Sequence, residues 1–269
     1  MYETEKVTTA QRVKKEEFYI AADGGGLERV TAEYISRYLE EMGYASHLGK
    51  IGEIDGSEGY SAVIAVGREA MDTASGLSGV EKICCVPDSY VEREGTVSPC
   101  LSSGSLARAA VLLFSHAESF TVLSQKEGAA DVQDACDYLD TCGVSYTVCS
   151  LDGAVYGDAV LSAVKQGCDV LIVPFGDISP MKGELKKYGT AVVAVGEGEP
   201  VSGAVATFCI DTERLSRYMA DLAVSRVTGR EEEPCEESFY KVCIDMDGAE
   251  EHDVDIEALR EDFCVAMVS

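Results

Sequence analysis

Short apolar runs alternate with helical segments along almost the whole chain from Phe18 onward. The runs are rich in β-branched residues and do not alternate strictly with polar ones, which is typical of strands buried on both faces of a parallel sheet. The fold class predicted from this pattern is α/β, with helices covering parallel sheets. The predicted strands are 18–22, 62–67, 82–86, 120–124, 145–150, 169–174, 191–196, 204–210 and 239–246, with a shorter one near 47–51.

Helices are predicted between most of these strands. From Leu27 to Met42, apolar residues recur at three- and four-residue spacing on one face. A long amphipathic helix follows Asp211 and Thr212, which are typical N-cap residues, and ends at Gly229. Further helices are predicted from Arg68 onward, over 105–117, 130–141, 154–166 and 181–188, and at the C-terminus.

The strands and helices fall into two successive blocks, which predicts two lobes. A segment rich in Gly, Pro and Ser at 91–104 interrupts the rhythm and is interpreted as a passage between them. The strand 204–210 and its helix form a surplus unit, which we expect to cross back and join the first lobe. Gly203, just before that strand, is therefore predicted to belong to the hinge. The predicted division is lobe 1 at 17–100 plus 203–230, lobe 2 at 101–202 plus 231–269, and a charged N-terminal extension at 1–16.

The formal net charge of −26 argues against nucleic acid and anionic membrane surfaces as partners, because both require clustered Lys and Arg. No run of about eighteen apolar residues occurs, so we expect no direct membrane span. The N-terminus is charged and shows no secretory signal.

The reactive side chains form no recognisable catalytic or metal-binding pattern. The eleven cysteines include no CxxC pair, and several lie inside apolar strand runs, where Cys behaves as a small hydrophobe. The three histidines, His47, His116 and His252, are isolated, so no metal site is expected. No G-x-S-x-G elbow and no paired carboxylates stand out. The prediction is a protein that is not an enzyme and that has neither catalytic residues nor a cofactor.

Several segments together resemble the substrate-binding proteins of ABC transporters, in the TrpX-like branch that binds aromatic or other small amino acids. DVLIVPFGDISP (169–180) resembles the strand and loop of that family that end in an Asp-bearing ligand loop. YSAVIAVGREAM (60–71), FTVLSQKEGA (120–129) and the stretch from Thr190 to Pro234 resemble further segments in the family's order. The resemblance covers residues 18 to 246 and depends on the order and spacing of these segments together.

The resemblance implies a type I periplasmic-binding fold, with two Rossmann-like doubly wound lobes joined by crossing strands. It implies a small polar solute, such as an amino acid, held in the interlobe cleft by hinge closure. An ABC permease would be the partner, and the location would be extracytoplasmic, as a lipoprotein or periplasmic protein. The free cysteines and the missing signal fit a cytoplasmic location, so the compartment stays open. Two alternatives also stay open: a small-molecule sensory domain of a signalling protein, and a degenerate interaction module.

Candidate ligand-binding residues lie directly after the strands, because ligands of parallel sheets bind beyond the carboxyl ends of the strands. There, free backbone N–H groups favour an anionic group, an acidic side chain suits an ammonium group, and an aromatic ring packs on a side chain. In lobe 1 the candidates are Asp23, Gly24, Gly25, Gly67, Arg68, Glu69 and Asp88. In lobe 2 they are Lys126, Glu127, Phe175, Asp177 and Glu197.

Asp177 is the leading ligand contact of this set, with a turn or capping role as the alternative. The DGGG run at 23–26 lacks the GxGxxG spacing and a P-loop lysine, so it is interpreted as a helix start that faces the cleft. Lys126, Glu127 and Gly128 stand where the family commonly offers an Asn or Ser pair to an amino-acid carboxylate. The loop after Asp177 also lacks the expected Asn. Amino-acid specificity therefore does not follow from the resemblance.

Overall fold

A computed structural model of the chain describes residues 16–22, 24–53, 59–87, 96–126, 131–151, 155–196, 198–230 and 239–268, together with Val91 and Gly153. These residues form two compact units, each built on its own sheet. Unit 1 comprises the described residues up to Val86, Thr96 and 216–230. Unit 2 comprises Pro87, Val91, 97–215 and 239–268.

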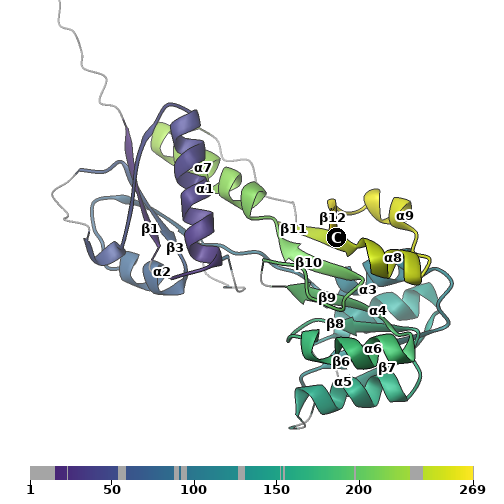
Figure 1. The fold of residues 1–269 in the computed structure, drawn as a ribbon. Coiled ribbons are helices and arrows are strands. Elements are labelled where there is room, and N and C mark those ends of the chain that lie inside the picture. Colours follow the sequence, from purple (N-terminus) through teal and green to yellow (C-terminus); the bar gives the residue numbers. More distant parts are fainter. Residues whose placement is uncertain are drawn as a thin grey trace, which may run out of the picture. The chain divides into compact units, whose positions relative to one another are not determined.

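The sheet of unit 1 has the strand order β2-β1-β3-β4-β5, and Figure 1 labels its strands β1 and β3. The strand β1 is parallel to both β2 and β3, and β3 is parallel to β4. All residues of β3 are buried, as expected for a strand covered on both faces. The bounds are β1 (Glu17–Ala22), β2 (Ala45–Gly49), β3 (Ala62–Val66), β4 (Glu81–Cys85) and β5 (Thr96–Val97).

Helices cover the two faces of this sheet. Tyr19 and Val63 share a core cluster with residues of α2 on one face. Because side chains alternate along a strand, the fully buried Phe18 and Ile64 point to the other face. Two helices lie side by side in unit 1 (Figure 1), and the hydroxyl of Ser216 on α7 donates to the carbonyl of Thr31 on α1 at 3.1 Å. The bounds are α1 (Leu27–Glu41), α2 (Arg68–Ala74) and α7 (Thr212–Thr228), with a 3-10 turn η1 at Ile51–Glu53.

The sheet of unit 2 has the strand order β12-β11-β10-β9-β8-β6-β7 (Figure 1). Its described pairings are parallel except for the antiparallel pair β10 and β11. The bounds are β6 (Ser119–Ser124), β7 (Ser145–Ser150), β8 (Val170–Val173), β9 (Ala191–Gly196), β10 (Ala206–Ile210), β11 (Tyr240–Asp245) and β12 (Val265–Val268).

The core of unit 2 lies on both faces of this sheet. One cluster contains Phe114, Phe120 and Phe208 and includes residues of α3, α4, α8 and α9. The other contains Leu123 and Leu171 and includes residues of α5 and α6. The bounds are α3 (Ser103–Leu113), α4 (Gln133–Cys142), α5 (Tyr156–Lys165), α6 (Lys182–Tyr188), α8 (Met246–Glu251) and α9 (Ile256–Arg260), with a 3-10 turn η2 at Ser179–Met181.

The predicted α/β class with two lobes is confirmed, but one strand was assigned to the wrong lobe. The strand 204–210, predicted to join lobe 1, is β10 of the unit 2 sheet. Its backbone pairs in parallel with β9, with Ala206 opposite Val193, and antiparallel with β11. Only the helix that follows it enters unit 1, from Ser216 onward. The pairing partner of an apolar strand is not encoded in its own pattern, which is why the sequence did not reveal it.

The ends of the chain add two differences from the sequence-based description. A final short strand, β12 (Val265–Val268), pairs with β11 and was not predicted. The predicted N-terminal extension lies outside the described residues, apart from Glu16. Among the described helices, none combines the length and the apolar character that a membrane span requires.

Candidate functional site

Each sheet contains a point at which the chain reverses the direction in which it adds strands. In unit 1 the chain goes from β1 to β2 on one side and then to β3 on the other. In unit 2 it goes from β6 to β7 on one side and then to β8 on the other. Doubly wound sheets bind ligands beyond the carboxyl ends of the strands at such switch points. The candidate site residues are therefore those after β1 and β3, and those after β6 and β8.

The switch point of unit 1 is built mostly of glycine backbone. Gly24, Gly25 and Gly26 stand between β1 and α1. Gly67 follows β3 with φ +100, a conformation that L residues other than glycine rarely adopt, and it caps α2. Its N–H donates to the carbonyl of Cys85 at 2.8 Å, so this turn is tied to the end of β4.

The carboxylate of Glu28 occupies the space beside these glycines. Glu28 lies in the first turn of α1 and is half-buried. A Cβ added to Gly24 would overlap Oε2 of Glu28, and a Cβ added to Gly67 would overlap Oε1. Two loops that are far apart in the sequence thus leave room for one carboxylate. Glu28 was not among the predicted site residues, because an acid in the first turn of a helix looks like an ordinary helix-start residue.

Two of the charged residues predicted in this unit, Arg68 and Glu69, open α2 directly after Gly67. Both are exposed. The structure therefore brings Gly24, Gly67 and Arg68 to the same edge of one sheet.

In unit 2, the loop that follows β6 is held by a carboxylate that the sequence did not single out. The hydroxyl of Ser124 and the N–H of Gln125 donate to the two oxygens of Asp131, the latter at 2.7 Å. Burial raises the pKa of Asp131, but these hydrogen bonds and the charge of Lys126 outweigh it and bring the pKa below its ordinary value. The exposed Lys126, a predicted site residue, thus stands on a loop anchored at Asp131.

The turn that follows β8 is built around two aromatic rings. The hydroxyl of Tyr156 donates to the carbonyl of Phe175 at 3.0 Å, and the two ring centroids are 6.1 Å apart. A Cβ on Gly176, whose φ is +80, would lie 2.6 Å from Cζ of Tyr156. Burial, with a further contribution from the charge of Asp177, raises the pKa of Tyr156 to about 12. The sequence predicted Phe175 at this position, whereas Tyr156 was missed.

Asp177 is exposed, and its carboxylate bonds to the backbone of the turn that follows it. Its carboxylate accepts a hydrogen bond at 2.9 Å from the N–H of Ser179, which begins η2. The hydrogen bonds from Ser179 hold the pKa of Asp177 below its ordinary value. The structure thus gives Asp177 the turn role that was weighed against ligand contact.

Ser150 adds a buried polar atom near the same edge of unit 2. It ends β7 and pairs in register with Ser124 of β6. Its Oγ is buried and has no hydrogen-bond partner among the described residues. A buried hydroxyl without a partner is costly unless something else bonds to it.

Other predicted site residues have a different outcome. Asp23, Asp88, Glu127 and Glu197 lie outside the described residues. Gly203 has φ +94, and a Cβ there would lie 3.1 Å from Cβ of Lys182. It stands between two strands of the same sheet, β9 and β10, so the strand crossing that motivated its assignment to the hinge does not occur.

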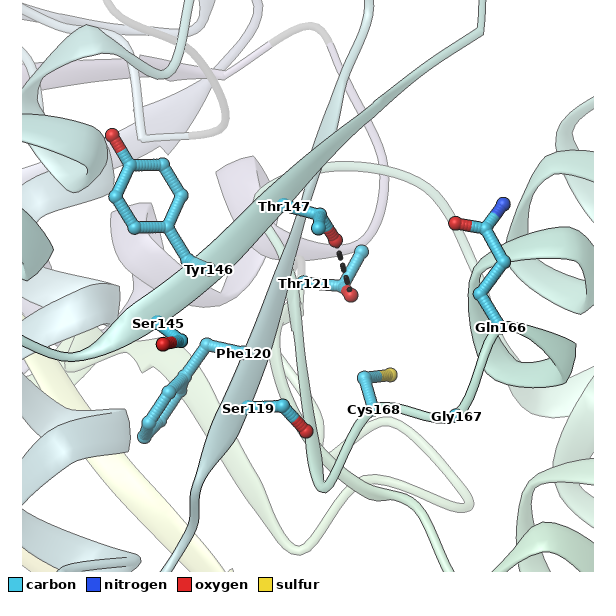
Figure 2. Close-up of a pocket in the computed structure, with 9 residues that line it drawn as sticks. All are labelled: Ser119, Phe120, Thr121, Ser145, Tyr146, Thr147, Gln166, Gly167 and Cys168. Carbon is cyan, nitrogen blue, oxygen red and sulfur yellow. Dashed lines mark hydrogen bonds between the residues drawn. The ribbon is translucent and has the colours of Figure 1, made fainter.

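A groove of about 170 Å³ lies at the opposite edge of the unit 2 sheet, where β6 and β7 begin (Figure 2). Its lining includes Ser119, Ser145, Gln166 and Cys168. The hydroxyls of Thr121 and Thr147 lie 3.0 Å apart beside it (Figure 2). Because this groove is at the amino ends of the strands, it is separate from the switch point. Within the described residues, no group of three or more His, Cys, Asp and Glu is arranged to hold a metal ion.

Comparison with known proteins shows the fold. No protein-family model matches the sequence, and no curated protein matches it. Among solved structures, the ligand-free, open structure of CD0873, a substrate binding protein with adhesive properties from Clostridium difficile, is similar with a TM-score of 0.70 at 12% identity, over 95% of this chain and 100% of that one. An ABC domain in complex with L-Trp from Streptococcus pneumonia gives a TM-score of 0.56 at 15% identity, over 93% of this chain and 100% of that one.

A third solved structure has a different bound molecule. It is a carbohydrate transporter solute binding protein from Agrobacterium radiobacter in complex with D-arabinose, with a TM-score of 0.53 at 10% identity, over 86% of this chain and 94% of that one. At these identities the likeness shows the fold, which is the two-lobed type I periplasmic-binding-like fold.

Proposed function

We propose that the protein binds a small polar solute without chemical conversion, as the recognition component of ABC-type uptake. The observation that carries this proposal is the pair of switch points, each with polar or charged groups directly after the strands. Two solved structures of the same fold hold L-Trp and D-arabinose. These ligands are small and polar, which supports the same class of ligand for this chain.

The proposed contacts come from both units. A carboxylate of the solute would accept hydrogen bonds from backbone N–H groups at helix starts or from a cationic side chain. Phe175 offers an aromatic surface against an apolar part of the solute. The contacts proposed within the described residues are Gly24, Gly25, Gly67, Arg68, Glu69, Lys126, Phe175 and Asp177. Asp23, Asp88, Glu127 and Glu197 remain proposals from the sequence.

We further propose that binding brings the two units together around the solute, as in hinge closure. An ABC permease would then receive the solute from the closed form. The amino-acid branch of the family is the first class of ligand to test, and sugars are the second.

A ligand screen tests the proposal. The panel is L-tryptophan, L-tyrosine, L-leucine, L-lactate, uridine and D-arabinose, read out by thermal unfolding and small-angle X-ray scattering. A ligand at 100 times its Kd stabilises the folded state by about 2.7 kcal/mol, which raises Tm by roughly 5–10 °C for units of this size. The radius of gyration is expected to fall with the same compound.

Two lysines provide a matched pair for this test. Lys126 stands after β6, whereas Lys165 ends α5 and lies on the exposed surface away from the switch point. Lys126→Ala is expected to reduce the ligand-induced rise in Tm, and Lys165→Ala is expected to leave it unchanged. A panel in which no compound raises Tm contradicts the proposed function.

A further inference from the structure

Two cysteines lie on the pair of strands through which the chain leaves unit 2 and returns to it. Cys209 is on β10, which leads into α7, and Cys243 is on β11, which begins after the chain has come back from unit 1. The two strands are antiparallel neighbours (Figure 1). We infer that the sulfurs of Cys209 and Cys243 form a binding site for one soft monovalent cation, Cu(I). This site uses strands other than those of the switch points and does not rest on the proposed function.

The register of the two strands puts both sulfurs on one face of the sheet. Cys209 stands opposite Lys241, and Cys243 stands opposite Thr207, which is two residues before Cys209. Side chains alternate between the two faces along a strand, and Phe208 belongs to the core cluster on the other face. The two cysteines are therefore diagonal neighbours on the same face.

This spacing suits a bridging ion better than a disulfide. Diagonal neighbours in an antiparallel pair are about 7–8 Å apart, whereas the Cα atoms of a disulfide lie about 4.4–6.8 Å apart. A direct bond between the sulfurs would require the strands to shift, because the two side chains alone do not span this distance. An ion between the sulfurs lengthens the bridge by one further bond. Thiolates select Cu(I) among the soft ions, and Cu(I) accepts two of them in a nearly straight S–Cu–S arrangement.

The two thiols already contact each other in a buried place. The exposed fraction is 0% for Cys209 and 4% for Cys243. The thiol of Cys209 donates a hydrogen bond to the sulfur of Cys243. A thiophilic ion would take the place of the proton between them, and the buried surroundings would keep water from competing as a ligand.

The number of ligands favours Cu(I) over zinc. Structural zinc sites in proteins have four ligands. Among the described residues, no third His, Cys, Asp or Glu is arranged with these two sulfurs to hold a metal ion. A pair of thiolates therefore suits an ion that is satisfied by two ligands.

The occupied site has a counter-charge in Lys241. Two thiolates and one monovalent cation carry one net negative charge, which is costly to bury without a positive partner. Lys241 stands directly opposite Cys209, and its charge acts on both sulfurs. The carboxylates of Glu199 and Asp211 act with the opposite sign, the first on Cys209 and the second on Cys243. Lys241 thus balances the charge that the ion and its two ligands leave.

The variants separate loss of a ligand from loss of the counter-charge. Cys209→Ala and Cys243→Ala each remove one sulfur, and Cys136→Ala is their control, because it removes a buried thiol from the core cluster on the other face. Lys241→Met keeps both sulfurs and removes the positive charge. Lys165→Met, at the exposed end of α5, is its control.

The measurement must exclude other thiols of the chain. Cys100, Cys142 and Cys264 are exposed, and Cys235 lies outside the described residues. The full chain therefore carries Cys100→Ser, Cys142→Ser, Cys235→Ser and Cys264→Ser in every sample. Competition with bicinchoninate, without oxygen, measures the affinity and stoichiometry for Cu(I), and X-ray absorption at the copper K-edge counts the sulfur ligands. Incubation is overnight, because an ion reaches buried sulfurs only through local opening.

We expect one Cu(I) per chain, bound by two sulfurs. Cys209→Ala and Cys243→Ala should each lose this ion, and Cys136→Ala should retain it. Lys241→Met should weaken Cu(I) binding about tenfold, with Lys165→Met unchanged.

Three results would overturn the inference: no uptake of Cu(I), an ion that both alanine variants retain, or an ion bound by three sulfurs. If the alanine variants do not fold, Lys241→Met decides, because an unchanged affinity there contradicts the counter-charge and with it the site. The solute panel is read separately, so failure of this inference leaves the proposed function standing.

Discussion

The two switch points differ in the groups that form them, which are mainly glycine backbone in unit 1 and hydrogen-bonded side chains in unit 2. In unit 1, the described residues between β1 and α1 and between β3 and α2 are glycines, and the Glu28 carboxylate lies beside them. In unit 2, the loops are fixed by side chains: Asp131 binds Ser124 and Gln125, and Tyr156 binds the carbonyl of Phe175. Substitution of a glycine is tolerated where the neighbouring side chain is flexible, whereas it is not tolerated where a half-buried ring and a hydrogen-bonded carboxylate fix the loops. We therefore expect substitutions at the unit 1 edge to affect recognition and those at the unit 2 edge to affect stability.

The largest expected effect is that of Gly176→Ala in unit 2. Its φ of +80 disfavours a side chain, and a Cβ would lie 2.6 Å from the ring of Tyr156. Backbone strain of about 1–2 kcal/mol and steric overlap of about 1–3 kcal/mol together predict a loss of roughly 2–5 kcal/mol in the free energy of unfolding. Urea unfolding followed by circular dichroism measures this loss.

Gly153→Ala is the matched control for Gly176→Ala. Gly153 has the same φ of +80, but a Cβ there has nothing within 4 Å. Gly153→Ala introduces the backbone strain without the steric overlap. We therefore expect it to lower the free energy of unfolding by less than Gly176→Ala does. Equal losses in the two variants would show that the contact with Tyr156 contributes nothing. Gly24→Ala in unit 1 is expected to cost least of the three, since only a flexible carboxylate moves.

The second prediction concerns Asp131 in acid. The pKa of this carboxyl is lower in the folded chain than the ordinary value of 3.8. Its contribution to stability is therefore present above about pH 4 and is lost as the pH falls through the folded pKa. Asp131→Asn is expected to lower the free energy of unfolding by about 1 kcal/mol at pH 7, allowing for the exposure of the residue.

Urea unfolding at pH 7 and pH 3 checks whether the contribution of Asp131 to stability decreases as the pH falls. The difference between Asp131→Asn and the unsubstituted chain should shrink at pH 3, where the carboxyl in the unsubstituted chain is losing its charge. Asp158→Asn, an exposed acid in the first turn of α5, controls for the loss of one negative charge. A difference of the same size at both pH values would mean that the hydrogen bonds of Asp131 do not stabilise the loop.

The fold was predictable from the sequence because its signal is local. Most buried strands are short, mainly apolar runs, and helices with one apolar face separate them, which is sufficient to predict two parallel sheets. The placement of β10 was not predictable in this way. Its residues are all buried, and their apolar character suits either sheet equally well. The hydrogen bonds to β9 and β11 decide between the sheets, and these are long-range properties.

The candidate site was predictable only where it follows a strand directly. Gly67 and Phe175 were chosen as candidates because the carboxyl end of a strand is visible in the sequence. Glu28 and Asp131 were missed because each acts at a distance from its strand end. Asp131 lies seven residues after Ser124, and their bond exists only once the loop is closed. Tyr156 was missed for the same reason, since Phe175 is nineteen residues away from it.

An effect as small as that of Asp131→Asn is expected for Tyr156→Phe, which keeps the ring and removes one hydrogen bond. The hydroxyl donates to the carbonyl of Phe175 at 3.0 Å, so its loss should cost about 1 kcal/mol at pH 7. Because the pKa of Tyr156 is raised from 10.0 to about 12, its contribution is present below pH 10 and is lost as the pH rises through about 12. Unfolding at pH 7 and pH 11 should therefore show a smaller difference between the variant and the unsubstituted chain at the higher pH.

Tyr188→Phe, at a side chain that is 43% exposed, should change the free energy of unfolding at neither pH. A larger loss at pH 11 than at pH 7 would have the opposite sign and would exclude the buried, neutral phenol as the stabilising group of this turn.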